Sequence, residues 1–228
     1  SAADRSHRGI FHAVFGPLGL SPALVFGRGF VWQLVTYAFL HDPRNLFHIL
    51  FNMLFLYWFG RPLEAAWGTR RFLLFYLGGA VFAGLVFCLW HVFDPLTWCI
   101  GASGAVMAAM MVYALWFPNQ IILLFFIIPM RMRTFVFFVI IVEMFQLLSQ
   151  EHGVANMAHL GGLLYGWVVA RAGPRFLRRV VWKIRARDER ATVEDDRRLD
   201  EILAKIHDAG MNSLTWGEKR FLKRMGRR

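Results

Sequence analysis

The chain has 228 residues, of which 57% are apolar, and it carries 23 Phe, 9 Trp and a net charge of +11. Charges are few between Leu46 and Val169, and most of the basic residues follow Ala170. This composition excludes a basic globular protein and favours a membrane protein with a basic tail that meets water or an anionic phospholipid bilayer. The tail contains no nucleic-acid readout motif, so we expect no nucleic-acid partner.

The first apolar stretch, residues 22–40, is interrupted by Gly27-Arg28-Gly29. The remaining part, residues 30–40, would cover only about 16 Å as a helix. The hydrocarbon core of a bilayer is roughly 30 Å thick, so this part is too short to cross it. We therefore predict a partly inserted segment, which belongs to an extracytoplasmic region over residues 1–43.

Longer apolar runs predict five membrane-spanning helices, because about 20 apolar residues are needed to cross a bilayer. The runs cover about residues 45–59, 72–92, 100–117, 134–148 and 154–170. The stretch 121–129 is too short for a span, and we place it in the connection before the fourth one. The prediction is an all-α polytopic membrane domain over residues 44–172.

Loop charges predict the orientation of these spans, because Lys and Arg concentrate on the cytoplasmic side. Arginines follow the first span, precede the fourth and follow the fifth, whereas loops 91–99 and 149–156 contain no Lys or Arg. The N-terminal segment is therefore expected outside and the C-terminal tail in the cytosol.

The tail, residues 173–228, contains its own helical signals. Leu199, Ile202, Leu203 and Ile206 recur at helical spacing, and Gly210 follows as a stop. The sequence Thr215-Trp216-Gly217-Glu218 has the form of a capping box at the start of a second helix. We predict a short helical hairpin, which serves either as a docking or dimerisation module or as a stabilising tail.

Ser103 lies between glycines in Gly101-Ala102-Ser103-Gly104, where a polar turn enters the third span. Small residues in membrane helices usually serve helix packing, so the motif alone favours that role for Gly101 and Gly104. At a helix start, however, the Ser103 backbone N–H belongs to the unpaired set that suits a developing oxyanion.

His159 begins the fifth span on the same outer side as Ser103. An ionisable residue inside a membrane helix is costly and is by default a functional candidate. Gly162 and Gly166 lie on the face of His159 and allow a neighbouring helix to approach closely. Close approach is what a serine–histidine hydrogen bond requires.

His48 and Asn52 are one helical turn apart on the first span, again toward its outer half. Both side chains can donate hydrogen bonds. They can stabilise helix contacts or a water pocket, or they can form an oxyanion hole beside the Ser103 N–H. Polar groups at one depth in three spans favour a common site.

With these residues the chain resembles the bacterial rhomboid intramembrane serine proteases, over about residues 20–170. The matching motifs are Trp32 to His41, His48-x-x-x-Asn52, Gly60-x-x-x-Glu64, Gly101-Ala102-Ser103-Gly104, Phe117-Pro118-Asn119 and Ala158-His159-x-x-Gly162-x-x-x-Gly166. The tail hairpin also looks like one appended to some bacterial members.

The resemblance implies a serine endopeptidase of the bacterial inner membrane that cleaves transmembrane segments of other proteins. Its catalytic pair would be Ser103 and His159, with no acidic third residue, and its oxyanion site would combine His48, Asn52 and the Ser103 backbone. Residues 22–41 would form the membrane-inserted first loop. No cofactor and no metal are expected, and no feature indicates an oligomeric state. The alternative is a catalytically silent relative that binds or retains membrane clients.

Several positions depart from the family pattern. Gln33 replaces a basic residue after Trp32, and Met107 replaces an aromatic residue expected to stack on the catalytic histidine, where a sulfur–aromatic contact can substitute. Glu143 lies within the fourth span, and we expect it to be a structural partner of a neighbouring span. The family core has six spans, so the resemblance predicts a further apolar span before Ser1.

Overall fold

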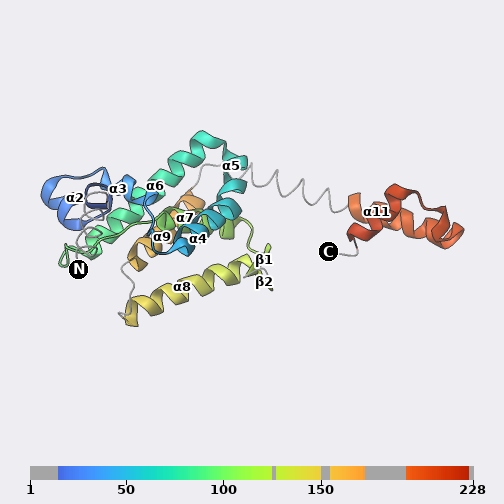
Figure 1. Cartoon of the computed structure of the whole chain (residues 1–228). Coiled ribbons are helices and arrows are strands. Elements are labelled where there is room, and N and C mark those ends of the chain that lie inside the picture. Colours follow the sequence, from blue (N-terminus) through green and yellow to red (C-terminus); the bar gives the residue numbers. More distant parts are fainter. Residues whose placement is uncertain (1–14, 125–126, 150–154, 173–193, 226–228) are drawn as a thin grey trace. The chain divides into compact units, whose positions relative to one another are not determined.

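A computed structural model describes residues 15–124, 127–149, 155–172 and 194–225 of the chain (Figure 1). The chain divides into two compact units, Ser1–Pro174 and Arg175–Arg228. Most of the described residues are helical, which confirms the predicted helical class. The domain boundaries expected at residues 43 and 172 stay predictions.

The N-terminal segment consists of short helices rather than one long one. Helix α2 (Pro22–Arg28) ends where Gly29 adopts a left-handed conformation with φ of 72°, and α3 (Gln33–Thr36) and the 3₁₀ turn η1 (Tyr37–Phe39) follow. The Gln33 side chain is fully buried, and its amide oxygen accepts a hydrogen bond from the Ser21 backbone at 3.1 Å. Its amide nitrogen donates to the Gly16 carbonyl at 3.0 Å. Gln33 thus anchors this segment internally.

The next helical segment runs over residues 46–67 without a break in helical backbone angles. It comprises α4 (Leu46–Phe55), a π-helical turn η2 (Leu56–Gly60) and α5 (Arg61–Trp67). At 1.5 Å per residue the whole segment is about 33 Å long. Helix α6 (Thr69–Trp90) follows directly after Gly68.

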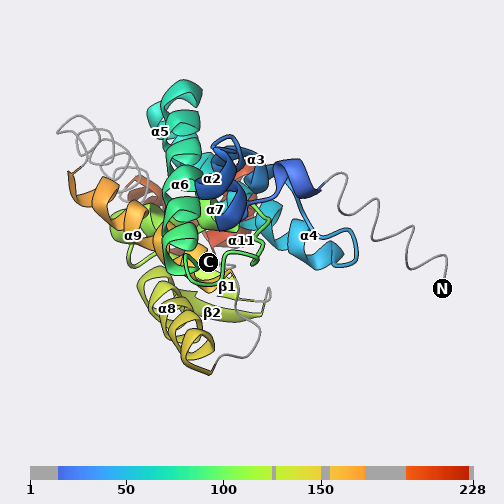
Figure 2. The ribbon, with the colours of Figure 1, turned by 90° about the vertical axis from the view of Figure 1, so that its left-hand side faces the viewer.

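The bundle is centred on α7 (Ser103–Trp116), with α4, α6 and α9 (Asn156–Ala172) around it (Figures 1 and 2). Most of α7 is buried, because small residues such as Ala105, Ala108 and Ala109 let the neighbouring helices approach. Helix α8 (Met132–Ser149) lies along one side of the bundle and exposes much of its apolar surface (Figure 2).

A small β-hairpin connects α7 and α8. Strand β1 (Ile121–Leu124) pairs antiparallel with β2 (Ile128–Arg131), so that Ile121 lies opposite Arg131. The placement of residues 121–129 in a connection is therefore right, but the expectation of an all-α domain needs this correction. Four-residue apolar runs are long enough for strands and too short for a span.

Two of the described helices, Thr69–Trp90 and Met132–Ser149, are by themselves long and apolar enough to cross a membrane. The apolar helix Ser103–Trp116 is shorter. The most apolar 18-residue stretch of Thr69–Trp90 has a mean hydropathy of 2.3 and is half buried. That of Met132–Ser149 has a mean hydropathy of 1.7 and is only 22% buried. The other three spans stay predictions.

The second unit contains a helix over residues 194–209, a 3₁₀ turn η3 (Met211–Ser213) and α11 (Trp216–Met225). Ile202, Leu214 and Phe221 form its buried apolar core. The capping box is confirmed, because the Glu218 carboxylate accepts the Thr215 N–H at 2.6 Å and Thr215 Oγ1 accepts the Glu218 N–H at 3.4 Å. This unit is the predicted helical hairpin.

Candidate active site

Ser103 is the first residue of α7, preceded by a turn that only glycine can make easily. Gly101 has a φ of +125°, and a Cβ atom there would lie 2.7 Å from Nε2 of His48. The Gly101 N–H donates to the Tyr37 carbonyl at 2.9 Å, so the N-terminal segment supports this turn. As a first-turn residue, Ser103 has a backbone N–H without an acceptor inside its own helix.

His159 lies in the first turn of α9, and its ring reaches Ser103 on α7. The distance from His159 Nε2 to Ser103 Oγ is 2.7 Å, which is a short hydrogen bond between the hydroxyl and the imidazole. The two residues are 56 positions apart in sequence and come from two neighbouring helices. A nucleophile within hydrogen-bond reach of a base is the arrangement that covalent hydrolysis needs.

Close packing of α7 against α9 makes this contact possible. A Cβ atom on Gly162 would overlap the Gly104 carbonyl oxygen, and one on Gly166 would overlap the Ala108 carbonyl oxygen. On α7, a Cβ atom on Gly104 would lie 2.6 Å from the Ala83 Cβ of α6. The backbones of the two helices therefore touch along the face that carries His159.

A carboxylate contacts the other nitrogen of the His159 ring. Glu143 Oε1 lies 2.8 Å from His159 Nδ1, and the Glu143 side chain is only 9% exposed. The resemblance implied a catalytic pair without an acidic third residue, and that stays a prediction, although a carboxylate does contact the His159 ring. Glu143 is indeed a partner of a neighbouring helix, but the partner is the histidine itself.

Asn156 and Gln146 complete this polar cluster between α8 and α9. The Asn156 amide nitrogen donates to Glu143 Oε2 at 2.8 Å and to Gln146 Oε1 at 2.9 Å. Asn156 precedes His159 by three residues, so both lie on one face of α9. No motif in the sequence marks Asn156 or Gln146 as a site residue, although Asn156 shares a helix face with His159.

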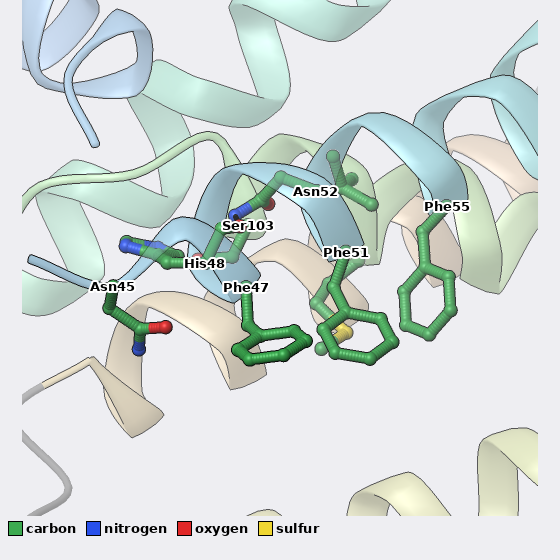
Figure 3. A pocket seen from close by; sticks show the side chains of 9 residues that line it. Asn45, Phe47, His48, Phe51, Asn52, Phe55 and Ser103 are labelled. Atoms are coloured by element: carbon green, nitrogen blue, oxygen red, sulfur yellow. Dashed lines mark hydrogen bonds between the residues drawn. The ribbon is translucent and has the colours of Figure 1, made fainter. Parts of the chain in front are cut away.

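His48 and Asn52 lie beside Ser103 in a cavity of about 270 Å³ between α4 and α7 (Figure 3). Asn52 is buried, and its amide nitrogen donates to the carbonyl of His48 at 2.8 Å, which leaves its second N–H hydrogen for another acceptor. The cavity is lined by Asn45, Phe47, His48, Phe51, Asn52, Phe55, Ser103, Val106 and Met107. The four predicted polar residues, Ser103, His159, His48 and Asn52, thus come together around one site.

Apart from Asn45 and the predicted site residues, the wall of this cavity is apolar and mostly aromatic. Phe47, Phe51 and Phe55 follow one another at four-residue spacing on α4, with successive ring centroids 6.2 Å apart (Figure 3). Met107 contributes to the wall, and its predicted sulfur contact with His159 stays a prediction. Among the described residues no cluster of three or more His, Cys, Asp or Glu side chains could hold a metal ion.

The fold and the site define a predominantly helical, apolar protein in which a serine hydroxyl on one helix lies 2.7 Å from an imidazole nitrogen on another. The chain matches the Rhomboid domain family over residues 28–175. It therefore belongs to the rhomboid family, whose members are integral membrane proteins.

Named relatives agree with this membership. The chain is 30% identical over 152 residues to RHOMBOID-like protein 12, mitochondrial, of Arabidopsis thaliana. The matched region covers 60% of this chain and 45% of that protein. It is 30% identical over 145 residues to Rhomboid protease GlpG of Yersinia pestis (strain Pestoides F) and of Yersinia pseudotuberculosis serotype O:3, covering 61% of this chain and 47% of each relative. The chain spans about half the length of the curated relatives it matches.

Proposed function

We propose that the chain is an intramembrane serine endopeptidase that cleaves transmembrane segments of other membrane proteins. The 2.7 Å contact between Ser103 Oγ and His159 Nε2 carries this proposal. The similarity to proteins named rhomboid proteases supports it. We also propose the bacterial inner membrane as the location, with five spans in this chain and the tail in the cytosol.

In the proposed reaction, Ser103 Oγ attacks the carbonyl carbon of the scissile peptide while His159 Nε2 takes the hydroxyl proton. The tetrahedral intermediate collapses to an acyl-enzyme, and the amine leaves with the proton from Nε2. Water then attacks the ester with His159 again as the base. The products are a carboxylic acid and regenerated Ser103.

The negative oxygen of the intermediate needs hydrogen-bond donors. The Ser103 N–H has no helical acceptor, Asn52 has a second amide hydrogen, and the His48 ring lines the same cavity. Donors placed before the reaction stabilise the transition state without reorganisation. We assign these three groups to the oxyanion site.

The aromatic wall of the cavity supports an apolar substrate. Phe47 and Phe51 are 66% and 41% exposed, so their rings are available to an unwound apolar segment. Burial of an apolar side chain against such a wall is favourable by about 25 cal/mol per Å² of apolar surface. The proposed partners are therefore transmembrane protein substrates.

Active-site labelling tests the assignment. A fluorophosphonate probe is expected to modify the purified protein in detergent micelles, and Ser103→Ala is expected to abolish the modification. Ser213→Ala, a serine substitution in the tail hairpin, is the matched control and should label like the wild type. Labelling that survives Ser103→Ala would remove the assignment. Binding of a transmembrane segment without cleavage would favour the silent, client-retaining alternative.

A further inference from the structure

We propose that Glu143 is a positioning residue for His159, so that the catalytic unit is a Ser103–His159–Glu143 triad rather than a pair. The proposal rests on the proposed function of Ser103 as the nucleophile. The observation that carries it is the buried carboxylate oxygen that lies 2.8 Å from His159 Nδ1, while Nε2 of the same ring lies 2.7 Å from Ser103 Oγ.

The two contacts select one form of the imidazole ring. A neutral imidazole has one N–H and one bare nitrogen, and the base that takes the serine proton must present the bare nitrogen to Ser103. Nδ1 then carries the hydrogen and donates it to Glu143 Oε1. An ionised carboxylate accepts only, so Glu143 holds the ring in the tautomer that Ser103 requires.

Both carboxylate oxygens have donors from α9. Oε1 faces His159 Nδ1, and Oε2 accepts from the Asn156 amide at 2.8 Å. Asn156 also lies within hydrogen-bond distance of the Gln146 side-chain oxygen and of the Glu143 carbonyl, so three oxygens surround its amide nitrogen. This environment fixes the orientation of the Asn156 amide and, through it, the orientation of the Glu143 carboxylate.

A purely structural link between α8 and α9 does not need the carboxylate. The Gln146–Asn156 hydrogen bond of 2.9 Å already joins the two helices. A carboxylate in an apolar helix costs several kcal/mol unless it is paired, so a neutral side chain would serve packing better. The charge is useful beside an imidazole that becomes positive during the reaction.

The chemical consequence lies in the step that charges the histidine. When Nε2 takes the Ser103 proton, the ring carries a positive charge and Nδ1 keeps its hydrogen. The Glu143 carboxylate stabilises this imidazolium through the Nδ1–H hydrogen bond and does not itself take the proton. Glu143 does not line the cavity beside Ser103, so it acts through His159 and not on the substrate.

The test compares Glu143→Gln, Glu143→Asp and Glu143→Leu with the wild type. Glutamine keeps the size and can still bond to Asn156, but it carries no charge. The readouts are the rate constant of fluorophosphonate labelling, kcat and KM on a model transmembrane substrate, and the unfolding temperature in micelles. Met144→Leu is the matched control, because Met144 lies next to Glu143 on the same helix, is exposed and is not part of the polar cluster.

We expect Glu143→Gln to lower the labelling rate and kcat by at least about tenfold with little change in KM. Glu143→Asp should recover part of the lost rate because it restores the charge, and Met144→Leu should label at close to the wild-type rate. A wild-type rate in Glu143→Gln would overturn the proposal. An equal loss of rate in Glu143→Gln, Glu143→Asp and Glu143→Leu, together with a lower unfolding temperature, would overturn the proposal in favour of a packing role for Glu143. If Ser103→Ala still labels, the proposed function fails first and the triad fails with it.

Discussion

Gly162 of α9 lies against the Gly104 carbonyl of α7 with no room for a side chain between them. This contact joins the helix that starts at Ser103 to the helix that carries His159. Because the backbones touch, the length of the serine–histidine hydrogen bond depends on the packing of these two glycines.

Gly162→Ala is expected to push α9 away from α7. The added methyl group would overlap a backbone oxygen, which cannot rotate away, so we expect a loss of about 1–3 kcal/mol of stability. The rate of fluorophosphonate labelling should fall as well, because His159 moves with α9. Thermal unfolding and labelling in micelles measure both effects. Gly27→Ala is the control, since a Cβ there meets nothing within 4 Å, and an unchanged unfolding temperature in Gly162→Ala would contradict the packing.

Asn52→Ala is expected to lower kcat on a transmembrane substrate on the order of 10²-fold, because one oxyanion donor is lost. Asn45→Ala is the matched control, since Asn45 lines the same cavity but is exposed and is not assigned to the oxyanion site. It should keep kcat near the wild-type value. Equal effects of the two substitutions would argue against an oxyanion role for Asn52.

Gln33→Leu is expected to destabilise the N-terminal segment. Its buried amide pairs the Ser21 N–H and the Gly16 carbonyl, and leucine would leave both groups without that partner. An unpaired buried polar group costs roughly 1–3 kcal/mol. Thermal unfolding in micelles should show the loss, whereas Gln120→Leu at an exposed position should not. A small loss for Gln33→Leu would mean that water replaces the amide.

The tail hairpin is expected to weaken in acid because of Glu218. The Thr215 backbone N–H, together with the Lys205 side chain, lowers the pKa of Glu218 from its ordinary value of 4.5 to about 2. A lowered pKa in the folded state means that the stabilisation is complete above pH 4.5 and is lost as the pH falls through about 2.

Amide hydrogen exchange in residues 194–225 of the whole chain measures this dependence. Glu218→Gln should exchange faster than the wild type at pH 7, and the two proteins should converge near pH 2. Glu201→Gln is the control, because its ion pair with Arg197 is largely exposed and contributes little. A difference that persists undiminished at pH 2 would show that the Glu218 charge is not its source.

The sequence predicted the contact between Ser103 and the His159 ring for a local reason. Each residue starts an apolar helix, and Gly162 and Gly166 mark the face of α9 that another helix approaches. Spacing on a single helix is enough to see such a face. Which neighbouring helix uses it follows only from the tertiary packing.

The contact of Glu143 with His159 could not be predicted in the same way. Helix α8 is apolar on nearly all sides, so its periodicity does not say which way Glu143 points. The β-hairpin and the π-helical turn at Leu56–Gly60 were also missed. Short apolar strands lack a periodic signal of their own, and a π-turn depends on packing around Gly60, where a Cβ would lie 2.9 Å from the Phe72 ring.

Helix α8 has few buried residues besides Glu143, and its large apolar side chains, such as Phe137 and Phe145, are mostly exposed. The carboxylate that contacts the His159 ring therefore lies on a helix with little buried surface. An outward displacement of α8 by little more than one ångström would break the 2.8 Å bond to His159. In the proposed triad, an outward position of α8 would separate Glu143 from His159 and so lower the basicity of the His159 ring. The proposed enzyme would then be inactive whenever the bundle is open at α8.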